Sequence, residues 1–331
     1  MKTLSISVAA YNMEKLIRQN LDSFVHSPVC ADVEVLVIND GSKDSTAQIV
    51  QEYAEKYPDT VKLINQPNAG PGSTVNRGME HATGKYFRMV DADDWVGDGF
   101  AGYVNVLKNI DVDMVLTNYT MVDDKTGEQR LCKVNGIAPG RVFDFADVCE
   151  NLFLEMHSTT FRTELLQQNQ IHLFNGFYTD LQYLLFPAPY VQTIYYADCN
   201  VYMYRVSLSG QSMSAPSMQR NIAMHEAVLF SLTDLYEKLK TQNPRVAGYV
   251  CRKAVMMAGT QMGTLLSFAP SKARKADLFA FFEKLQQACP DVYARFKTFK
   301  TARVLRLCGG VLYTPVSRMH RKKIGLVASN G

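Results

Sequence analysis

The first 120 residues alternate between two patterns of apolar positions. Nearly continuous apolar runs predict buried strands, and they fall at residues 4–10, 33–38, 61–64, 85–90 and 112–117. Apolar residues at helical spacing predict a helix over residues 17–25, and a second helix begins at Ser45, where Gln48 completes a capping-box pattern. Strands and helices that alternate across short loops predict an α/β domain with a mostly parallel sheet.

Polar clusters stand where three of these strands end. Tyr11 follows the first strand, Asp40 follows the second, and Asp91-Ala92-Asp93-Asp94 follows the fourth. Ligands of parallel sheets bind outside the carboxyl ends of the strands. Two carboxylates in an Asp-x-Asp arrangement suit a divalent metal that grips a diphosphate. Loop roles are the alternative: Asp40 as a turn residue, and Asp94 as the cap of a helix that follows Trp95.

The missing glycine motifs narrow the class of nucleotide site. The first strand leads into Tyr11-Asn12-Met13-Glu14 without the Gly-x-Gly-x-x-Gly of dinucleotide-binding domains, and the chain has no Gly-x-x-x-x-Gly-Lys-Ser/Thr phosphate loop. A sugar-nucleotide pyrophosphorylase would carry an early Gly-x-Gly-Thr-Arg loop, which is also absent. We therefore expect a metal, rather than a glycine cradle, to meet the phosphate charge.

Several motifs in order resemble glycosyltransferase family 2, which has the GT-A fold. They lie at residues 5–12, 37–46, 68–78, 82–86 and 91–95. A weaker block runs from Phe161-Arg162 through Asp180 to Tyr204-Arg205, so the resemblance covers about residues 1–206.

The resemblance implies roles for individual residues. Tyr11 would lie against the uracil or other base of a sugar nucleotide, Asp40 would accept a hydrogen bond from that base, and Asp91 would lie near the ribose. Asp93 would bind Mn²⁺ or Mg²⁺. The donor nucleotide would contact Ala9, Tyr11, Asp40, Asn68, Asp91 and Ala92.

The resemblance also implies inversion of the anomeric centre, with Asp180 as the catalytic base. A positioned base contributes on the order of 10²–10⁴ in rate. The alternative for Asp180 is an ordinary helix N-cap. The sequence departs from the family pattern at Ala10, Val75 and Thr179, where Pro, Arg and Glu are usual; these changes could alter donor and acceptor contacts.

Three further residues have two interpretations each. Tyr11 either stacks on a ligand or belongs to the core. His157 is a surface or core histidine, or a candidate for the acceptor side. Arg205 ends an aromatic-rich strand over residues 194–203, where it either reaches a diphosphate or is solvated on an edge strand.

The pattern predicts three regions. Residues 1–206 form a GT-A domain, with a nucleotide-sugar half (about 1–117) and an acceptor half (about 118–206). Residues 207–217, rich in Ser, Gly, Gln and Met, form a linker or mobile loop. Residues 218–331 are helical, and the charge-free stretch 254–271 is a buried helix rather than a membrane span.

Composition and charge bear on location and partners. The chain has 331 residues, a formal net charge of +3 and seven cysteines. The cysteines form no Cys-x-x-Cys motif and no signal-peptide pattern is evident, so we predict a cytoplasmic protein with reduced thiols.

Residues 292–331 carry Lys and Arg interleaved with apolar residues and no Asp or Glu. Such a basic amphipathic tail predicts peripheral association with an anionic membrane surface at the cytoplasmic face, and it is compatible with a lipid-linked acceptor. No nucleic-acid recognition motif accompanies it. A homo-oligomer is also compatible with the sequence.

Together these features predict an inverting, metal-dependent glycosyltransferase. It would move a sugar from a nucleoside-diphosphate donor, most simply a UDP-sugar, to a saccharide or lipid-linked acceptor in cell-surface polysaccharide synthesis. The alternative is a non-catalytic saccharide-binding or membrane-surface scaffold protein. Removal of Asp180 distinguishes the two, because only an enzyme would lose turnover while it still bound donor.

Overall fold

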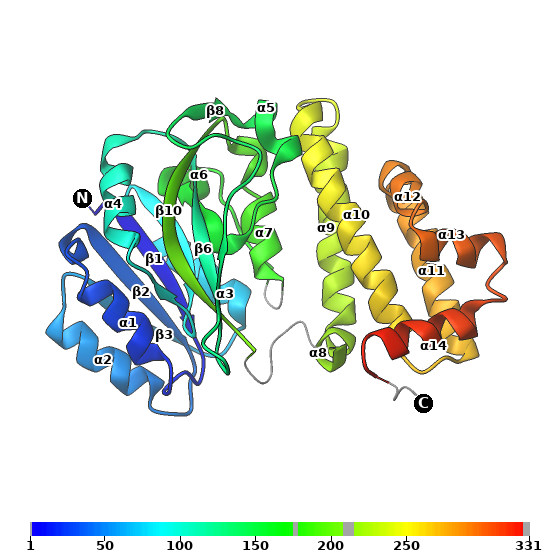
Figure 1. The fold of residues 1–331 in the computed structure, drawn as a ribbon, viewed down its shortest axis with the longest axis horizontal. Helices are drawn as coiled ribbons and strands as arrows, with labels where there is room; N and C mark the ends of the chain where they lie inside the picture. Colours follow the sequence, from blue (N-terminus) through cyan, green and yellow to red (C-terminus); the bar gives the residue numbers. More distant parts are fainter. Residues whose placement is uncertain (1, 175–177, 208–214, 327–331) are drawn as a thin grey trace. The chain divides into compact units, whose positions relative to one another are not determined.

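The chain divides into two compact units, Met1–Ser209 and Gly210–Gly331. The structure is a computed structural model that describes residues 2–174, 178–207 and 215–326. The first unit, coloured from blue to green in Figure 1, contains a sheet with flanking helices, and the described part of the second consists of helices and their connections. The predicted α/β domain followed by a helical region is confirmed. The division of residues 1–206 into two functional halves stays a prediction.

One ten-stranded sheet forms the centre of the first unit, in the order β3-β2-β1-β4-β9-β6-β10-β5, with β7 paired to β6 and β8 to β10. The four strands β3, β2, β1 and β4 are parallel, β9 runs antiparallel to β4 and β6, and β6 is parallel to β10. The strands are β1 (Leu4–Ala10), β2 (Val33–Asp40), β3 (Val61–Gln66), β4 (Tyr86–Asp91), β5 (Trp95–Val96), β6 (Met114–Asp123), β7 (Gln129–Cys132), β8 (Val142–Asp144), β9 (Thr159–Arg162) and β10 (Thr193–Val206).

Helices cover the sheet because the connections between parallel strands must cross over it. The helices are α1 (Ile17–Val25), α2 (Thr46–Lys56), α3 (Pro71–His81), α4 (Phe100–Asn109), α5 (Phe145–Val148), α6 (Thr163–Gln168) and α7 (Thr179–Leu185), with short 3₁₀ turns at Cys30–Asp32, Cys149–Asn151, Met156–Ser158 and Ala188–Tyr190. Helix α1 packs against α2, whereas α3 packs on β1 and β2 and contacts α6 and α7. The crossover from β3 back past β1 to β4 reverses direction, which brings α3 to the other face.

The predicted capping box at the start of α2 is wrong. Ser45 precedes the helix, but its side chain makes no capping hydrogen bond. Asp44 takes that role: its Oδ1 accepts from the backbone N–H of Thr46 at 3.0 Å and from the Thr46 hydroxyl at 2.6 Å. An aspartate one residue earlier competes successfully because its carboxylate is the stronger acceptor.

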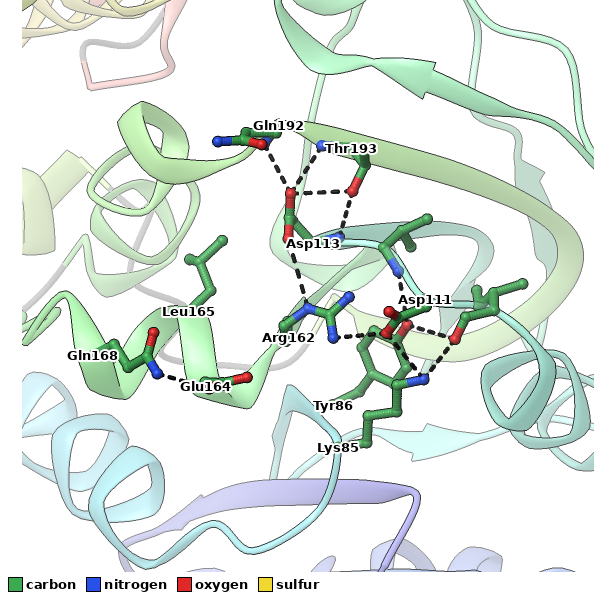
Figure 2. A network of polar contacts seen from close by, with 12 residues as sticks. Lys85, Tyr86, Asp111, Asp113, Arg162, Glu164, Leu165, Gln168, Gln192 and Thr193 are labelled. Atoms are coloured by element: carbon green, nitrogen blue, oxygen red, sulfur yellow. Dashed lines mark hydrogen bonds and ion pairs between the residues drawn. The ribbon is translucent and has the colours of Figure 1, made fainter.

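A polar network joins the strand ends opposite the predicted site (Figure 2). Arg162, at the end of β9, pairs with Asp111 at 2.7 Å and with Asp113 at 3.6 Å. Asp113 in turn accepts from the backbone N–H groups of Gln192 and Thr193, at 2.9 Å each, at the start of β10. The network therefore fixes β9 and the beginnings of β6 and β10 relative to one another.

Helix α10 is the centre of the second unit, where it packs against α8, α9, α11, α12 and α14. Asn243 caps it by accepting from Val246 N–H at 3.3 Å, and Pro244 occupies the first turn. The helices of this unit are α8 (Ala215–Arg220), α9 (Ile222–Leu239), α10 (Pro244–Ser267), α11 (Lys272–Ala288), α12 (Pro290–Phe296), α13 (Lys300–Leu307) and α14 (Tyr313–Lys323). The buried helix predicted within 254–271 is confirmed as the second half of α10.

Within the described ranges, none of the helices combines the length and the apolar character needed to span a membrane.

One boundary of the C-terminal prediction changes. The linker predicted over residues 207–217 ends too late, because Ala215 to Ser217 already belong to α8; residues 208–214 lie outside the described residues. The basic segment 292–331 is divided among several helices. Its described part contains most of α12 and all of α13 and α14, and these helices bury Val292, Phe296 and Leu305.

Candidate active site

The carboxyl ends of three parallel strands form one edge of the sheet. Ala9 of β1 lies between Ile38 of β2 and Asp91 of β4 as a backbone partner of both. Asp40 is the last residue of β2, and Tyr11 follows β1 directly. The sequence-predicted residues Ala9, Tyr11, Asp40 and Asp91 therefore occupy the same edge, as parallel pairing requires.

The loops after β1 and β2 are bound to each other. Asn12 has a φ of 56°, and its side chain accepts from Lys43 N–H at 2.8 Å. Asn12 N–H donates to the Ser42 hydroxyl at 3.1 Å. Tyr11, at the start of the first loop, is 43% exposed, so its interpretation as a core aromatic is wrong and its ring is accessible to a ligand.

Asp40 does more than form a turn. It is buried, and its carboxylate accepts from the N–H groups of Ala69 and Gly70 at 2.9 Å each and from Gln66 at 2.7 Å. The side chain of Asn68, which is exposed, donates to the Asp40 carbonyl at 2.9 Å. Asp40 thus holds the 66–70 loop beside the end of β2. Its predicted hydrogen bond to a nucleotide base would share a carboxylate that already has three donors.

Carboxylates gather after β4. Burial raises the pKa of Asp91 to about 7, and the negative charges of Asp93 and Asp180 add to the shift. Burial also raises the pKa of Asp93, although its own backbone N–H and Arg205 oppose the shift. Within the described part of the chain, no group donates a hydrogen bond to the Asp91 carboxylate. Ala92, which lies between Asp91 and Asp93 in the chain, is buried.

Asp94 does not cap a helix, contrary to the sequence prediction. After Trp95 comes the short strand β5, and α4 begins only at Phe100. Asp94 is buried and accepts from the Tyr202 hydroxyl at 2.6 Å and from Arg205 N–H at 2.7 Å. Burial and the charges of the neighbouring acids raise its pKa well above the usual range. Asp94 therefore anchors β10 to the loop that follows β4.

Arg205 is not a solvated arginine on an edge strand. Its side chain is 11% exposed and lies over the Trp95 ring at 4.8 Å. It donates to the Asp93 carbonyl at 2.9 Å and to Gln19 at 2.6 Å, and it pairs with Asp124. The guanidinium therefore binds the loop that follows β4, through Asp93 and Trp95. Its predicted contact with a diphosphate stays a prediction.

His157 lies beside the acids, which no sequence spacing indicated. Its ring packs on Tyr204 with centroids 4.0 Å apart and edge-on to Tyr202 at 5.0 Å. Burial lowers its pKa to about 3, and the charge of Arg88 adds to the effect. Its Nδ1 is buried and has no hydrogen-bond partner among the described residues. The ring is therefore neutral, the form that ligates metals.

Ligand atoms of Asp91, Asp94 and His157 all lie within 4.8 Å of one another, which makes them a candidate metal group. Sequence reasoning had instead assigned the metal to Asp93, and that assignment stays a prediction. The Asp94 oxygens already accept two hydrogen bonds, so Asp91 is the more available ligand. The pKa values of these carboxylates are raised by burial and by mutual repulsion, and a divalent cation would relieve that repulsion.

Asp180 lies near the acids that follow β4, although it is distant from them in the sequence. It lies in the first turn of α7, and its charge raises the pKa of both Asp91 and Tyr204. The N-cap position belongs to Tyr178, which has a φ of 67°. The alternative interpretation of Asp180 as an ordinary N-cap is therefore wrong. The exposed Asp180 carboxylate faces the acids after β4 closely enough for electrostatic interaction.

Comparison with known proteins identifies the class of protein to which this chain belongs. The family model described as "Glycosyl transferase family 2" matches residues 5–173. The structure of Staphylococcus aureus TarS residues 1–349 in complex with UDP-GlcNAc is similar over 98% of this chain and 92% of that chain, with a TM-score of 0.64 at 19% identity. The architecture is the GT-A fold.

Curated relatives share shorter segments. The uncharacterized glycosyltransferase YibD of Escherichia coli K12 is 44% identical over 93 residues, which cover 28% of this chain and 26% of YibD. The minor teichoic acid biosynthesis protein GgaB of Bacillus subtilis is 27% identical over 169 residues, 49% of this chain and 18% of GgaB. The chain thus spans about a quarter or less of the length of these two relatives. It belongs to glycosyltransferase family 2.

Proposed function

We propose that this chain is an inverting, metal-dependent glycosyltransferase that uses a UDP-sugar and acts on a saccharide or lipid-linked hydroxyl in cell-surface polysaccharide synthesis. The observation that carries the proposal is the convergence of Asp91, Asp93 and Asp180, where burial and like charge raise the pKa of Asp91 to about 7. An enzyme of this family needs a cation and a base at such a point, whereas a purely structural site would pair or disperse these charges.

The donor would bind across the carboxyl edge of β1, β2 and β4. Tyr11 offers an exposed ring to the base, and the backbone of Ala9 together with the Asp40 and Asn68 loops would border the nucleoside. Asp91 and Asp93 would hold Mn²⁺ or Mg²⁺, with His157 as a further ligand from the facing side. When bound, the cation stabilises the negative charge that develops on the leaving nucleoside diphosphate.

Asp180 would act on the acceptor. Its carboxylate takes the proton of the acceptor hydroxyl as that oxygen forms a bond to the anomeric carbon. The bond from the anomeric carbon to the phosphate oxygen breaks in the same step, and the nucleoside diphosphate leaves. A single displacement inverts the centre, whereas retention would require a second carboxylate as nucleophile, by analogy with glycosidases. The exposure of Asp180 supports this role, because the base must meet an incoming acceptor.

The comparisons support a UDP-sugar donor and a surface polymer only by similarity. The TarS complex contains UDP-GlcNAc, and GgaB is a teichoic acid biosynthesis protein by name. The basic residues of segment 292–331 would bring the enzyme to the anionic cytoplasmic face of a membrane, at about 1 kcal/mol for each Lys or Arg near the surface. A lipid-linked acceptor would be presented at that surface.

The first experiment measures the thermal stability of the purified protein with UDP, GDP and CDP, each with and without Mn²⁺. We expect stabilisation by UDP that requires metal and is lost in Asp93→Ala. Asp180→Asn should keep that stabilisation and lose turnover by about 10²–10⁴-fold. Asp98→Asn, an exposed acid in the same loop region, is the matched control and should keep both properties.

Three results would contradict the proposal. If none of the nucleotides stabilises the protein with or without metal, the donor site is wrong. If UDP binds but Asp180→Asn transfers sugar at the rate of the unaltered protein, a different group is the base. A protein that binds nucleotide but transfers sugar to none of the acceptors would favour the non-catalytic saccharide-binding alternative.

A further inference from the structure

The helical unit contains a cavity of about 780 Å³. Sites for small molecules occupy about 300–1,000 Å³, so this cavity is large enough to hold a ligand. Its wall comes from α8, α10, the residue before α13, α14 and the residue that follows α14. The lining residues are Ala215, Met218, Met256, Gly259, Thr260, Gly263, Thr264, Ser267, Phe299, His320 and Ile324.

The cavity wall carries no formal charge. None of its lining residues is Asp, Glu, Lys or Arg. Burial lowers the pKa of His320, partly opposed by a hydrogen bond with the Gly263 backbone, so the imidazole is mainly neutral at pH 7. Polar side chains on α10 donate hydrogen bonds to the backbone of their own helix: Thr264 donates to the Thr260 carbonyl at 3.1 Å, and Ser267 donates to the Thr264 carbonyl at 2.6 Å. An apolar occupant therefore leaves few polar groups without a partner.

Glycines on α10 help to keep the cavity open. Gly259 and Gly263 lie one turn apart, and a Cβ atom on Gly259 would lie 2.6 Å from the Phe299 ring. A Cβ atom on Gly263 would make only an ordinary contact, 3.5 Å from His320. A methyl group at 263 is therefore tolerated, whereas a large side chain there must project into the space beside His320.

Positive charge lies close to one residue of this wall, because the charge of Lys323 contributes to the lowered pKa of His320. Arg321, Lys322 and Lys323 lie in the chain between two lining residues, His320 and Ile324. Across the described residues, none of the basic side chains from Arg295 to Lys323 forms an ion pair with an acid. The Nε of Arg321 is buried and has no hydrogen-bond partner among those residues. Unpaired cations beside an uncharged cavity complement a molecule with an apolar chain and an anionic head.

The exposed apolar side chains between Leu307 and Met319 indicate that such a molecule would come from a membrane surface. Leu307 and Val311 are each 79% exposed, and Met319 is 67% exposed. Large exposed apolar side chains among Lys and Arg are typical of surfaces that lie against anionic membranes. We infer that the cavity of the helical unit holds one hydrocarbon chain of an anionic membrane phospholipid, whose phosphate meets the basic residues of α14. This site is separate from the donor edge and does not depend on the proposed reaction.

The test uses the full chain and monomeric lysophosphatidylglycerol, which has one acyl chain and one anionic phosphate, at concentrations below its micelle formation. Binding is measured by isothermal titration calorimetry, and we expect saturation at one lipid per chain. Gly263→Phe fills the cavity and should weaken binding at least about tenfold, the effect of displacing about two methylene groups. Gly263→Ala should bind as the unaltered protein does.

Three controls make the result specific. Gly102→Phe places the same substitution on an exposed helical glycine with open space around it, in the first unit, and should leave lipid affinity unchanged. Far-UV circular dichroism checks that Gly263→Phe keeps its helices. Glycerol phosphate, which has the head without a chain, should not bind measurably.

The inference is overturned if folded Gly263→Phe binds the lipid as well as Gly263→Ala does. Equal affinity for the zwitterionic lysophosphatidylcholine would overturn the role of the basic residues. Tighter binding of an isoprenoid phosphate than of lysophosphatidylglycerol would overturn the phospholipid as occupant. Stabilisation by UDP, measured on the same samples, reports separately on the donor site.

Discussion

Glu34 offers the sharpest test of how the first unit is held together. It lies near the start of β2, within an apolar strand, and is fully buried. One carboxylate oxygen accepts from the Ser5 hydroxyl at 2.6 Å and from the N–H and hydroxyl of Thr83 at 2.6 and 2.8 Å. The other accepts from the Lys62 ammonium at 2.8 Å. This one side chain therefore connects β1, β2, β3 and the loop before β4.

The electrostatic balance at Glu34 sets the size of the expected effect. Burial alone would raise the pKa, but the hydrogen bonds from Lys62, Ser5 and Thr83 outweigh it and lower the pKa from 4.5 to about 2. That shift corresponds to about 3 kcal/mol of folding free energy. Because the pKa falls on folding, this contribution is complete above pH 4.5 and disappears as the pH falls toward 2.

Glu34→Gln should therefore lower the free energy of unfolding by about 3 kcal/mol at pH 7. The difference between the two proteins should shrink by about 2 kcal/mol between pH 7 and pH 3. Urea unfolding followed by tryptophan fluorescence measures this for the first unit alone, since the chain has one tryptophan and it is Trp95. Glu52→Gln, which breaks a half-exposed pair with Arg18, is the control and should change stability little.

The reasoning is refuted if the free energy of unfolding of Glu34→Gln lies within about 1 kcal/mol of that of the unaltered protein at pH 7, well below the value that the pKa shift of Glu34 implies. It is also refuted if the difference between the two proteins stays constant from pH 7 to pH 3, because the charge of Glu34 would then contribute nothing.

Three further substitutions test other parts of the first unit by the same fluorescence assay. Gly78→Ala should cost about 1–3 kcal/mol, because its Cβ would lie 2.0 Å from the Ser7 hydroxyl oxygen; Gly102→Ala, with open space, should be neutral or slightly stabilising. Arg205→Lys should cost about 1–2 kcal/mol, since an ammonium cannot reproduce the guanidinium's spread of hydrogen bonds; an unchanged midpoint would contradict that role. Asp113→Asn should cost about 1–3 kcal/mol by weakening the network of Figure 2; unaltered stability would show that solvent replaces it.

Local pattern was sufficient to predict the parallel half of the sheet. Strands β1, β2 and β4 are buried on both faces, so their apolar character is clear, as in Val33–Asp40, where all eight residues are buried. The edge strand β3 is partly exposed. The short strands β5, β7, β8 and β9 were missed. Each has two to four residues, too few to show a pattern of apolar positions. Strands β5, β8 and β9 also pair with strands distant in the sequence, so tertiary contacts rather than propensity determine them, whereas β7 forms a local hairpin with β6.

The site residues that directly follow predicted strands could be predicted from the sequence. The residues that tertiary contacts bring to the site could not. Asp40 and Asp91 stand at strand ends, which parallel topology alone brings together. The role of Asp94 was mistaken because its partners, Tyr202 and Arg205, lie in β10. The sequence marked His157 only as a candidate for the acceptor side and not as a metal ligand, since a single histidine in a 3₁₀ turn has no ligand spacing around it. The place of Asp180 came from family resemblance, not from its local sequence.

The bond between Asp94 and Tyr202 has a consequence for how the protein is made. The two residues are 108 positions apart in the chain. At a translation rate of about 5–20 residues per second, Asp94 leaves the ribosome roughly 5–20 seconds before its partner does. During that interval β1 to β4 can pair. The Asp94 carboxylate still lacks its hydrogen-bond donors in β10 and remains hydrated. The nascent chain thus carries an unfinished sheet edge until β10 arrives, and unpaired strand edges are prone to misassembly.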